Sequence, residues 1–174
     1  MGKIAPAKPV KLIIGFIFKE KKCLAKAKTL LIKHFGRIDS ESRIMPFTST
    51  PYYRDEFGQA LKRMFISFKK LIPAQQIAAI KILTNKIEKK LSSDDKRTVN
   101  IDPGYLNSAK LVLASTKDYV HRIYLGKGIY AEITLFFQDK TFRPGQWTYP
   151  DYRSVDYIAF FNRIREVYNA QTKK

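Results

Sequence analysis

The positions of apolar residues predict that strands and helices alternate along the chain. Residues 10–18 are apolar on both faces of an extended segment, apart from Lys11, and this pattern is typical of a central strand. Residues 22–35 carry apolar side chains at helical spacing and end at Gly36, so we expect a helix there. A strand is expected near residues 43–47. Thr50 and Pro51 then resemble an N-cap and first helical position for a turn over residues 52–57.

The second half of the chain continues this pattern. Residues 61–68 read as a strand, and Pro73 opens a helix with an apolar stripe from Ile77 to Leu91. A strand over residues 97–101 is followed by an expected turn at Asp102-Pro103-Gly104, and residues 110–115 read as a short buried strand or a helix. A hairpin and a C-terminal helix capped by Ser154 complete the chain.

The predicted fold class is therefore α+β, with one domain over residues 1–174. This length is sufficient for a single hydrophobic core. The order begins β-α-β-β-α-β, which allows a split β-α-β core in a mixed or antiparallel sheet, and a C-terminal hairpin and helix follow.

The hairpin around Gly126-Lys127-Gly128 can be read in more detail. A three-residue turn sets Tyr124 opposite Tyr130 and Arg122 opposite Glu132. Side chains alternate along each strand, so the apolar face is expected to carry Ile123, Ile133 and, opposite Ile133, the side chain of His121. There it is either a hydrogen-bonded core residue or a catalytic group. The opposite face carries the Arg122–Glu132 pair, which is either a structural ion pair or part of a site.

Composition changes this picture mainly through charge. The formal net charge is +18, and the excess is greatest in residues 1–50 and consists mostly of lysine. Much of it falls on the two predicted helices. These lysines form either an ordinary solvated face or a surface that binds a polyanion.

Cys23 is the only cysteine, which rules out an intramolecular disulfide and suits a reducing cytoplasm. The apolar run at residues 10–18 is too short to span a bilayer, so we expect a cytoplasmic protein without a membrane segment.

Several specific chemistries fail the motif test. Gly126-Lys127-Gly128 lacks the upstream glycine and the following Ser or Thr of a P-loop, and the segment 127–133 lacks the aromatic positions of an RNA-recognition sheet. Two distant histidines and one cysteine give no zinc site. Asp102, Asp118 and Asp151 are too scattered to indicate a cation site, and we explain Asp102 and Asp151 by turn formation beside proline.

The chain nevertheless resembles a known family in several blocks. These are the N-terminal MGK-I-x-P-x-K-P-V-K-L-I-I-G, then VNIDPGYL, LVLASTKDYVHRIYLGKGIYAEITL, WTYPDYRS and FFNRIREVY. They are similar to a family of small prokaryotic proteins catalogued only as a domain of unknown function, some members of which carry an automatic label of GTP-binding protein. The family's signature blocks coincide with Asp102 to Tyr105, Ser115 to Asp118, His121-Arg122, the glycine turn and Trp147 to Arg153. They do not coincide with the lysine-rich helices.

Arginine and tyrosine in these blocks are therefore better candidates for a site than the helical lysines, since Arg recognises phosphate or carboxylate through paired hydrogen bonds. Our leading hypothesis is a binding module for a phosphate-bearing ligand, a nucleotide or RNA, through Tyr105, Lys117, Arg122, Lys127, Tyr149 and Arg153. The rival is a small enzyme in which Asp102 or Asp118 and His121 act as acid and base, with Arg122 or Arg153 as a clamp. A third possibility is a protein-interaction subunit. Cofactor, substrate and oligomeric state stay open.

Overall fold

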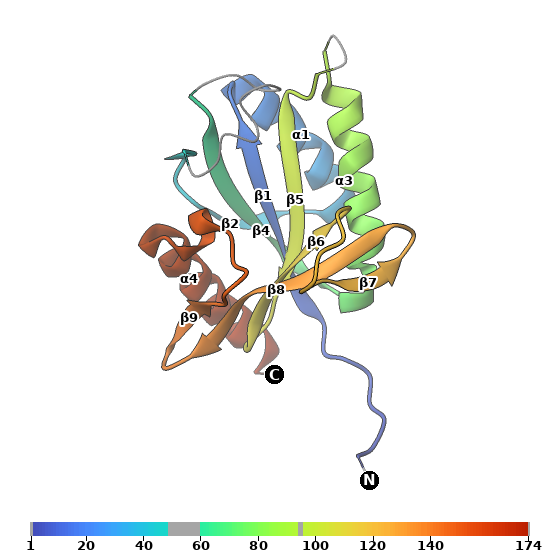
Figure 1. The fold of residues 1–174 in the computed structure, drawn as a ribbon, viewed down its shortest axis with the longest axis vertical. Coiled ribbons are helices and arrows are strands. Elements are labelled where there is room, and N and C mark those ends of the chain that lie inside the picture. Colours follow the sequence, from blue (N-terminus) through green and yellow to red (C-terminus); the bar gives the residue numbers. More distant parts are fainter. Residues whose placement is uncertain (1, 49–59, 94–95, 174) are drawn as a thin grey trace.

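A computed structural model describes residues 2–48, 60–93 and 96–173 (Figure 1). The predicted helical turn that begins at Thr50-Pro51 and ends at Gly58 lies outside these residues. The elements in chain order are β1 (Val10–Phe18), α1 (Lys21–Phe35), β2 (Ile38–Glu41), β3 (Met45–Pro46), β4 (Lys62–Ile72), η1 (Ala74–Gln76), α3 (Ile77–Leu91), β5 (Val99–Leu106), β6 (Lys110–Ser115), β7 (Ile123–Gly126), β8 (Ile129–Gln138), β9 (Thr141–Pro144), η2 (Pro150–Arg153) and α4 (Val155–Thr172).

The strands form one antiparallel sheet in the order β2-β4-β1-β5-β6-β8-β7, with β3 beside β4 and β9 beside β8. Strand β1 pairs with β4 on one side and β5 on the other. Because β4 runs antiparallel to both β1 and β2, the segment β1-α1-β2 is a split β-α-β unit, and β4-α3-β5 is a second one around β1. The α+β prediction and the central position of residues 10–18 are confirmed.

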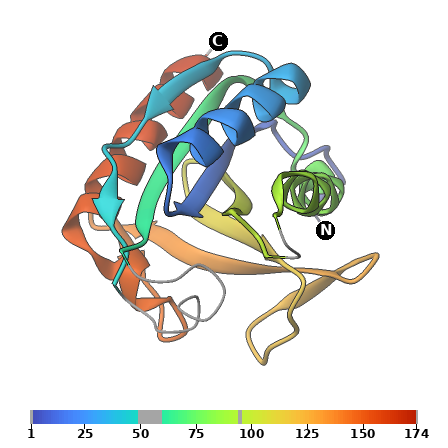
Figure 2. The same ribbon diagram turned by 90° about the horizontal axis from the view of Figure 1, so that it is seen from above.

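Helices cover both faces of the sheet (Figure 2). Helices α1 and α3 pack on one face, where Leu31 and Ile80 meet Phe16 of β1 in one hydrophobic cluster. Helix α4 packs on the other face, where Phe161 meets Phe65 of β4 in a second cluster. Ser154 caps α4 as predicted, since its side chain accepts a hydrogen bond from the backbone N–H of Tyr157. Among the described residues, no helix is long and apolar enough to cross a membrane.

The predicted turn at Asp102-Pro103-Gly104 is wrong, because β5 runs straight through these residues. Pro103 lacks a backbone N–H, but it pairs only with Ile14 of β1, at a point where β6 has not yet joined β5. Gly104 is the first residue of β5 that pairs with β6. A Cβ atom there would lie 2.6 Å from Leu113 Cδ2 and would collide with the carbonyl oxygen of Val112, so close strand contact explains the glycine.

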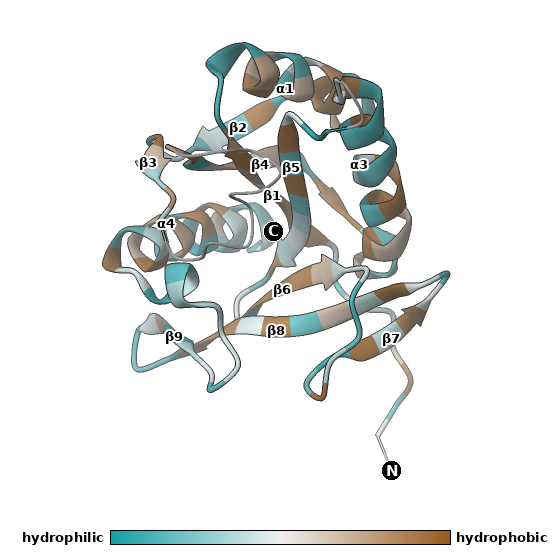
Figure 3. Cartoon of the chain, turned by 45° about the horizontal axis from the view of Figure 1, so that its top comes forward, coloured by the Kyte–Doolittle hydropathy of each residue, from teal (hydrophilic) through white to brown (hydrophobic). Residues whose placement is uncertain are grey.

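The hairpin prediction is confirmed for two cross-strand pairs and is wrong in its turn and in part of its faces. Gly126 pairs with Ile129, so the turn consists of Lys127 and Gly128 rather than three residues. Tyr124 lies opposite Tyr130 and Ile123 opposite Ala131, but β7 begins only at Ile123. His121 therefore does not lie opposite Ile133 on a core face. Beyond β6 the sheet bends away from β1 and β5 (Figure 3). The expected core side chains Ile123 and Ile133 are exposed as a result, while Glu132 and Thr134 on the other face are buried.

Candidate pocket between β5 and β6

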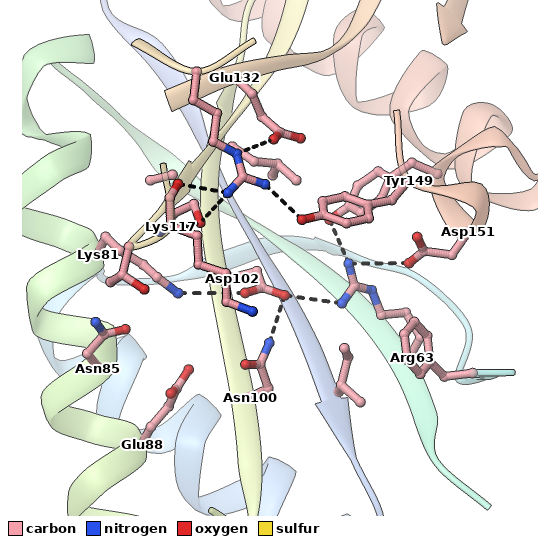
Figure 4. Close-up of a pocket in the computed structure, with 18 of the residues that line it drawn as sticks. Arg63, Lys81, Asn85, Glu88, Asn100, Asp102, Lys117, Glu132, Tyr149 and Asp151 are labelled. Atoms are coloured by element: carbon pink, nitrogen blue, oxygen red, sulfur yellow. Dashed lines mark hydrogen bonds and ion pairs between the residues drawn. The ribbon is translucent and has the colours of Figure 1, made fainter. Parts of the chain in front are cut away.

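A pocket of about 410 Å³ opens where β5 and β6 diverge. The two strands pair only over Gly104 to Leu106, at the end of β5, whereas β6 pairs with β8 along its whole length. The first half of β5 thus has β1 as its partner on one side, and the pocket on the other. Helix α3, the segment after β6 and the region of η2 supply the remaining walls. Figure 4 shows the polar side chains from these elements converging on the pocket.

Arg63 of β4 lies at the centre of one wall. Its side chain is 3% exposed, and its Nη1 lies 3.3 Å from Asp102 Oδ2 while its Nη2 lies 3.7 Å from Asp151 Oδ2. Nη2 also donates a 2.7 Å hydrogen bond to the hydroxyl of Tyr152, and the guanidinium lies over the Phe65 ring. Its Nε is buried and has no hydrogen-bond partner among the described residues. A buried cation of this kind costs free energy and is retained only where several groups compensate it.

The two carboxyl groups beside Arg63 have different environments. Burial disfavours the charged form of Asp102, but the ammonium of Lys81 and the guanidinium of Arg63 outweigh it and hold the pKa of Asp102 below its ordinary value. Asn100 also donates a 2.7 Å hydrogen bond to Asp102 Oδ2. Burial raises the pKa of Asp151, since the attraction of Arg63 and the hydrogen bonds from the backbone N–H groups of Asp151 and Tyr152 are too weak to offset it. Two carboxyl groups with opposite shifts flank one guanidinium.

Helix α3 brings a second group of charges to the pocket. Lys81, Asn85 and Glu88 are spaced at helical intervals, so their side chains lie on one side of the helix. Glu88 accepts a 2.6 Å hydrogen bond from the backbone N–H of Ile101, and Arg97 Nη1 lies 3.3 Å from its other oxygen. Burial raises the pKa of Glu88 nonetheless. Lys81 donates to the carbonyl oxygen of Ile101 at 3.2 Å.

Arg122 is held at the pocket wall by four hydrogen bonds. Its Nε donates to Glu132 at 2.8 Å, and its Nη2 donates to the Tyr149 hydroxyl at 2.8 Å. Its Nη1 donates to Ser115 Oγ at 3.1 Å and to the carbonyl oxygen of Lys117 at 2.8 Å. Burial opposes the charge, but the hydrogen bond and attraction of Glu132 still raise the pKa of Arg122. The ion pair predicted between Arg122 and Glu132 is confirmed, although Arg122 precedes β7.

The candidate residues from the sequence divide into two groups. Asp102, Lys117, Arg122 and Tyr149 line the pocket together, although they are up to 47 positions apart in the chain. The other candidates do not line it. The catalytic or binding roles of these other candidates remain predictions.

His121 and Asp118 lie beside the pocket rather than in it. His121 Nε2 is 3.0 Å from Glu132, and its ring stacks on Trp147 at 5.7 Å. His121 and Arg122 therefore contact the same carboxylate, but only Arg122 lines the pocket. Asp118 is exposed, and its carboxylate accepts a 2.8 Å hydrogen bond from the backbone N–H of Tyr119.

Tyr105, Lys127 and Arg153 lie elsewhere. Tyr105 packs half-buried against the α1/α3 cluster, and burial raises its pKa. Lys127 is exposed in the hairpin turn with a φ of 55°. Arg153 donates to the backbone carbonyls of Thr148, Gly145 and Gln146 at 2.9–3.1 Å, so it holds the loop that carries Tyr149. Its observed contacts are structural.

The sequence did not indicate Arg63, Lys81, Glu88, Asn100 or Asp151 as site residues. Arg63 follows Lys62 at the start of the predicted strand over residues 61–68, so its charge alone did not distinguish it from a solvated residue. Asp151 was explained as a turn residue, yet its carboxyl group is buried beside Arg63. Among the described residues, no group of three or more His, Cys, Asp or Glu side chains is arranged to hold a metal ion.

The fold and pocket define an α+β protein with a polar, charge-lined cavity at the bend of its sheet. The chain belongs to the family described as Domain of unknown function (DUF4416), whose model matches residues 8–168. This match covers nearly the whole chain and confirms the resemblance found in the sequence. No curated protein and no solved structure matches the chain.

Proposed function

We propose that this pocket binds a small phosphate-bearing ligand of nucleotide size. The observation that carries the proposal is the gathering of five cationic side chains on its walls: Arg63, Lys81, Arg97, Lys117 and Arg122. A volume of about 410 Å³ is in the range of small-molecule sites. Arginine and lysine donors recognise phosphate and carboxylate groups, and the oxygens of one phosphate can accept from several of these donors at once.

The carboxylates of the pocket do not cancel this preference. Glu132 accepts from Arg122, and Glu88 accepts from a backbone N–H. Asp102 accepts from Asn100 and Arg63, and Asp151 lies 3.7 Å from Arg63. Each of them holds a donor in a fixed position. A ligand phosphate would thus meet guanidinium groups that are already oriented, which reduces the entropy cost of binding.

Titration of the purified protein with inorganic phosphate and with adenosine and guanosine mono-, di- and triphosphates tests this proposal. Calorimetry should detect at least one of these compounds, with affinity that falls as salt rises. Lys117→Gln and Tyr149→Phe should weaken it about tenfold, since a charge-assisted hydrogen bond contributes about 1.5–3 kcal/mol. Arg163→Gln on the exposed side of α4 is the matched control. No binding at millimolar concentrations, or equal loss in the control, refutes the proposal.

A second candidate function is an enzyme, and the pair Asp102 and Asp151 favours it. Their carboxyl groups flank Arg63, and their pKa values shift in opposite directions. Environments that separate the pKa values of two carboxyl groups are typical of acid and base pairs. If a ligand from the panel is turned over, Asp102→Asn and Asp151→Asn should each stop turnover while binding persists. Turnover that survives both changes excludes this mechanism.

We further propose that the protein acts in the cytoplasm, since its lone cysteine, Cys23, suits a reducing compartment. Fractionation of cells that express a tagged chain tests this assignment. Recovery of the chain outside the cytoplasm contradicts it.

A further inference from the structure

Exposed lysines of α1 and α3 form a layer of one charge sign. We define the lysine face as Lys22, Lys26 and Lys33 of α1 together with Lys86, Lys89 and Lys90 of α3, all of which are exposed. Neither helix contains an exposed carboxylate, because the two sequences include one acidic residue, Glu88, which is 5% exposed and faces the pocket. The surface of both helices therefore presents positive charge alone.

The lysine face lies on two helices that are neighbours on one side of the sheet. The apolar sides of α1 and α3 pack on the same face of the sheet, and the two helices contact one another, as Figures 1 and 2 show. Lys26 and Lys33 lie opposite Leu24, Ala27 and Leu31 on the helical wheel, so they point away from the sheet. At 1.5 Å per residue, the lysines of α1 extend over roughly 16 Å of helix.

Within the described part of the chain, most of these charges have no carboxylate partner. Lys22 forms an exposed ion pair with Glu20, which precedes α1. Across the described ranges, no ion pair involves the other five lysines. Helix α4, on the other face of the sheet, differs because it exposes both charge signs, with Asp156 and Glu166 as well as Arg163. Soluble proteins usually intersperse the two signs, and a large field of one sign steers a charged partner.

We propose that the lysine face binds the sugar–phosphate backbone of a single-stranded nucleic acid, independently of the pocket. Several lysines on one surface suit the repeating charge of a phosphate backbone, and such contacts need no sequence readout. A lipid surface is less suitable, because helices that lie on membranes insert apolar side chains. The apolar sides of α1 and α3 are already buried against the sheet. On their outer surface, Ile32 is the large hydrophobic residue that is exposed.

The test compares two triple variants with a control that removes the same charge. Lys22→Gln, Lys26→Gln and Lys33→Gln change α1, and Lys86→Gln, Lys89→Gln and Lys90→Gln change α3. The control changes three exposed lysines outside both helices, Lys3, Lys140 and Lys173. Binding of a labelled single-stranded RNA, and of DNA of the same sequence, is followed by fluorescence anisotropy between about 50 and 200 mM salt. Thermal unfolding confirms that each variant is folded.

Each face variant should bind RNA or DNA about tenfold more weakly at the lowest salt, and its plot of log affinity against log salt should be shallower by about 2. The control should stay within about twofold of the unchanged protein. Equal losses in the control would mean that overall charge alone is responsible, and would overturn the proposal. So would failure of the unchanged protein to bind either strand, including a case in which it binds phosphatidylserine vesicles instead.

The test of the lysine face can be distinguished from the test of the pocket. Lys117→Gln and Tyr149→Phe should reduce phosphate or nucleotide binding while strand binding to the lysine face persists. If the pocket proposal fails, the triple variants still decide the role of the lysine face. If strand binding is lost equally in Lys117→Gln or Tyr149→Phe, the two sites are not independent and the proposal is wrong.

Discussion

Replacement of Glu132 by leucine should destabilise the protein strongly, because Arg122 would lose its counter-charge. Both side chains are buried, with 3% of Arg122 and 2% of Glu132 exposed. The remaining partners of the guanidinium are neutral oxygens of Ser115, Lys117 and Tyr149. A buried ion pair that loses one member typically costs about 3–5 kcal/mol of unfolding free energy. We expect Glu132→Leu to fall in this range.

The double variant Arg122→Met with Glu132→Leu should cost less than the sum of the single changes. Removal of both charges leaves no uncompensated ion, and apolar side chains of similar volume can fill the space. The coupling free energy of the two changes should reach about 2 kcal/mol. The exposed pair of Arg43 and Asp156 provides a control, since Arg43→Gln should cost less than about 1 kcal/mol.

Urea unfolding followed by fluorescence measures these free energies. Trp147 is the only tryptophan, and its indole ring stacks on His121, which contacts Glu132. Its emission should therefore report both unfolding and changes near Arg122. A cost below about 1 kcal/mol for Glu132→Leu, or additive costs in the double variant, would refute the reasoning about the buried ion pair.

Four further changes test other parts of the structure. Gly104→Ala should lower the unfolding free energy by about 1–3 kcal/mol, because its Cβ would collide with β6; Gly2→Ala, which meets no neighbour within 4 Å, should not change it in the same urea assay. Asp151→Asn should stabilise the protein at pH 7. The raised pKa of Asp151 means that its favourable contribution is complete below the unfolded value of 3.8 and is lost as the pH rises through the folded pKa. Thermal unfolding from pH 3 to pH 7 should show this advantage grow with pH, and a less stable variant at pH 7 would contradict it. Burial raises the pKa of Tyr157 to about 12, so its contribution is complete below pH 10 and is lost as the pH rises through 12; Tyr157→Phe should flatten the fall in melting temperature over that range, and an unchanged profile would argue against this cause. Arg153→Ala should cost about 1–3 kcal/mol in urea, since the side chain donates to three carbonyls, and should weaken ligand binding less than Lys117→Gln; the reverse order would restore Arg153 as a ligand contact.

Much of the fold could be predicted because its signals are local. The run over residues 10–18, which is apolar apart from Lys11, has no solvated face and therefore indicated a central strand, and its bounds match β1. The 3.6-residue period defined α1 and most of α3 in the same way. The hairpin faces failed for a reason outside the local sequence. The bend of the sheet exposes Ile123 and Ile133, which alternation alone would bury.

About half of the candidate site residues could be identified from the sequence, again because their signals are local. Lys117 and Arg122 lie within one short segment, so a local reading brought them together. Arg63 and Asp151 are 88 positions apart, and only the pairing of β4 with β1 and the packing of η2 set their side chains 3.7 Å apart. No periodicity in the sequence carries that information.

Asp102 shows how one wrong local assignment conceals a site. If Asp102 were a turn residue beside proline, turn formation alone would account for its polar side chain, and no partner would be needed. As a strand residue, it must share a face with Asn100, since side chains alternate along β5. Two polar side chains on one face of a buried strand require donors or charges opposite them, and Arg63 and Lys81 supply these. The decisive feature is that β6 leaves β5 at Gly104, because this opens the space in which these four side chains meet.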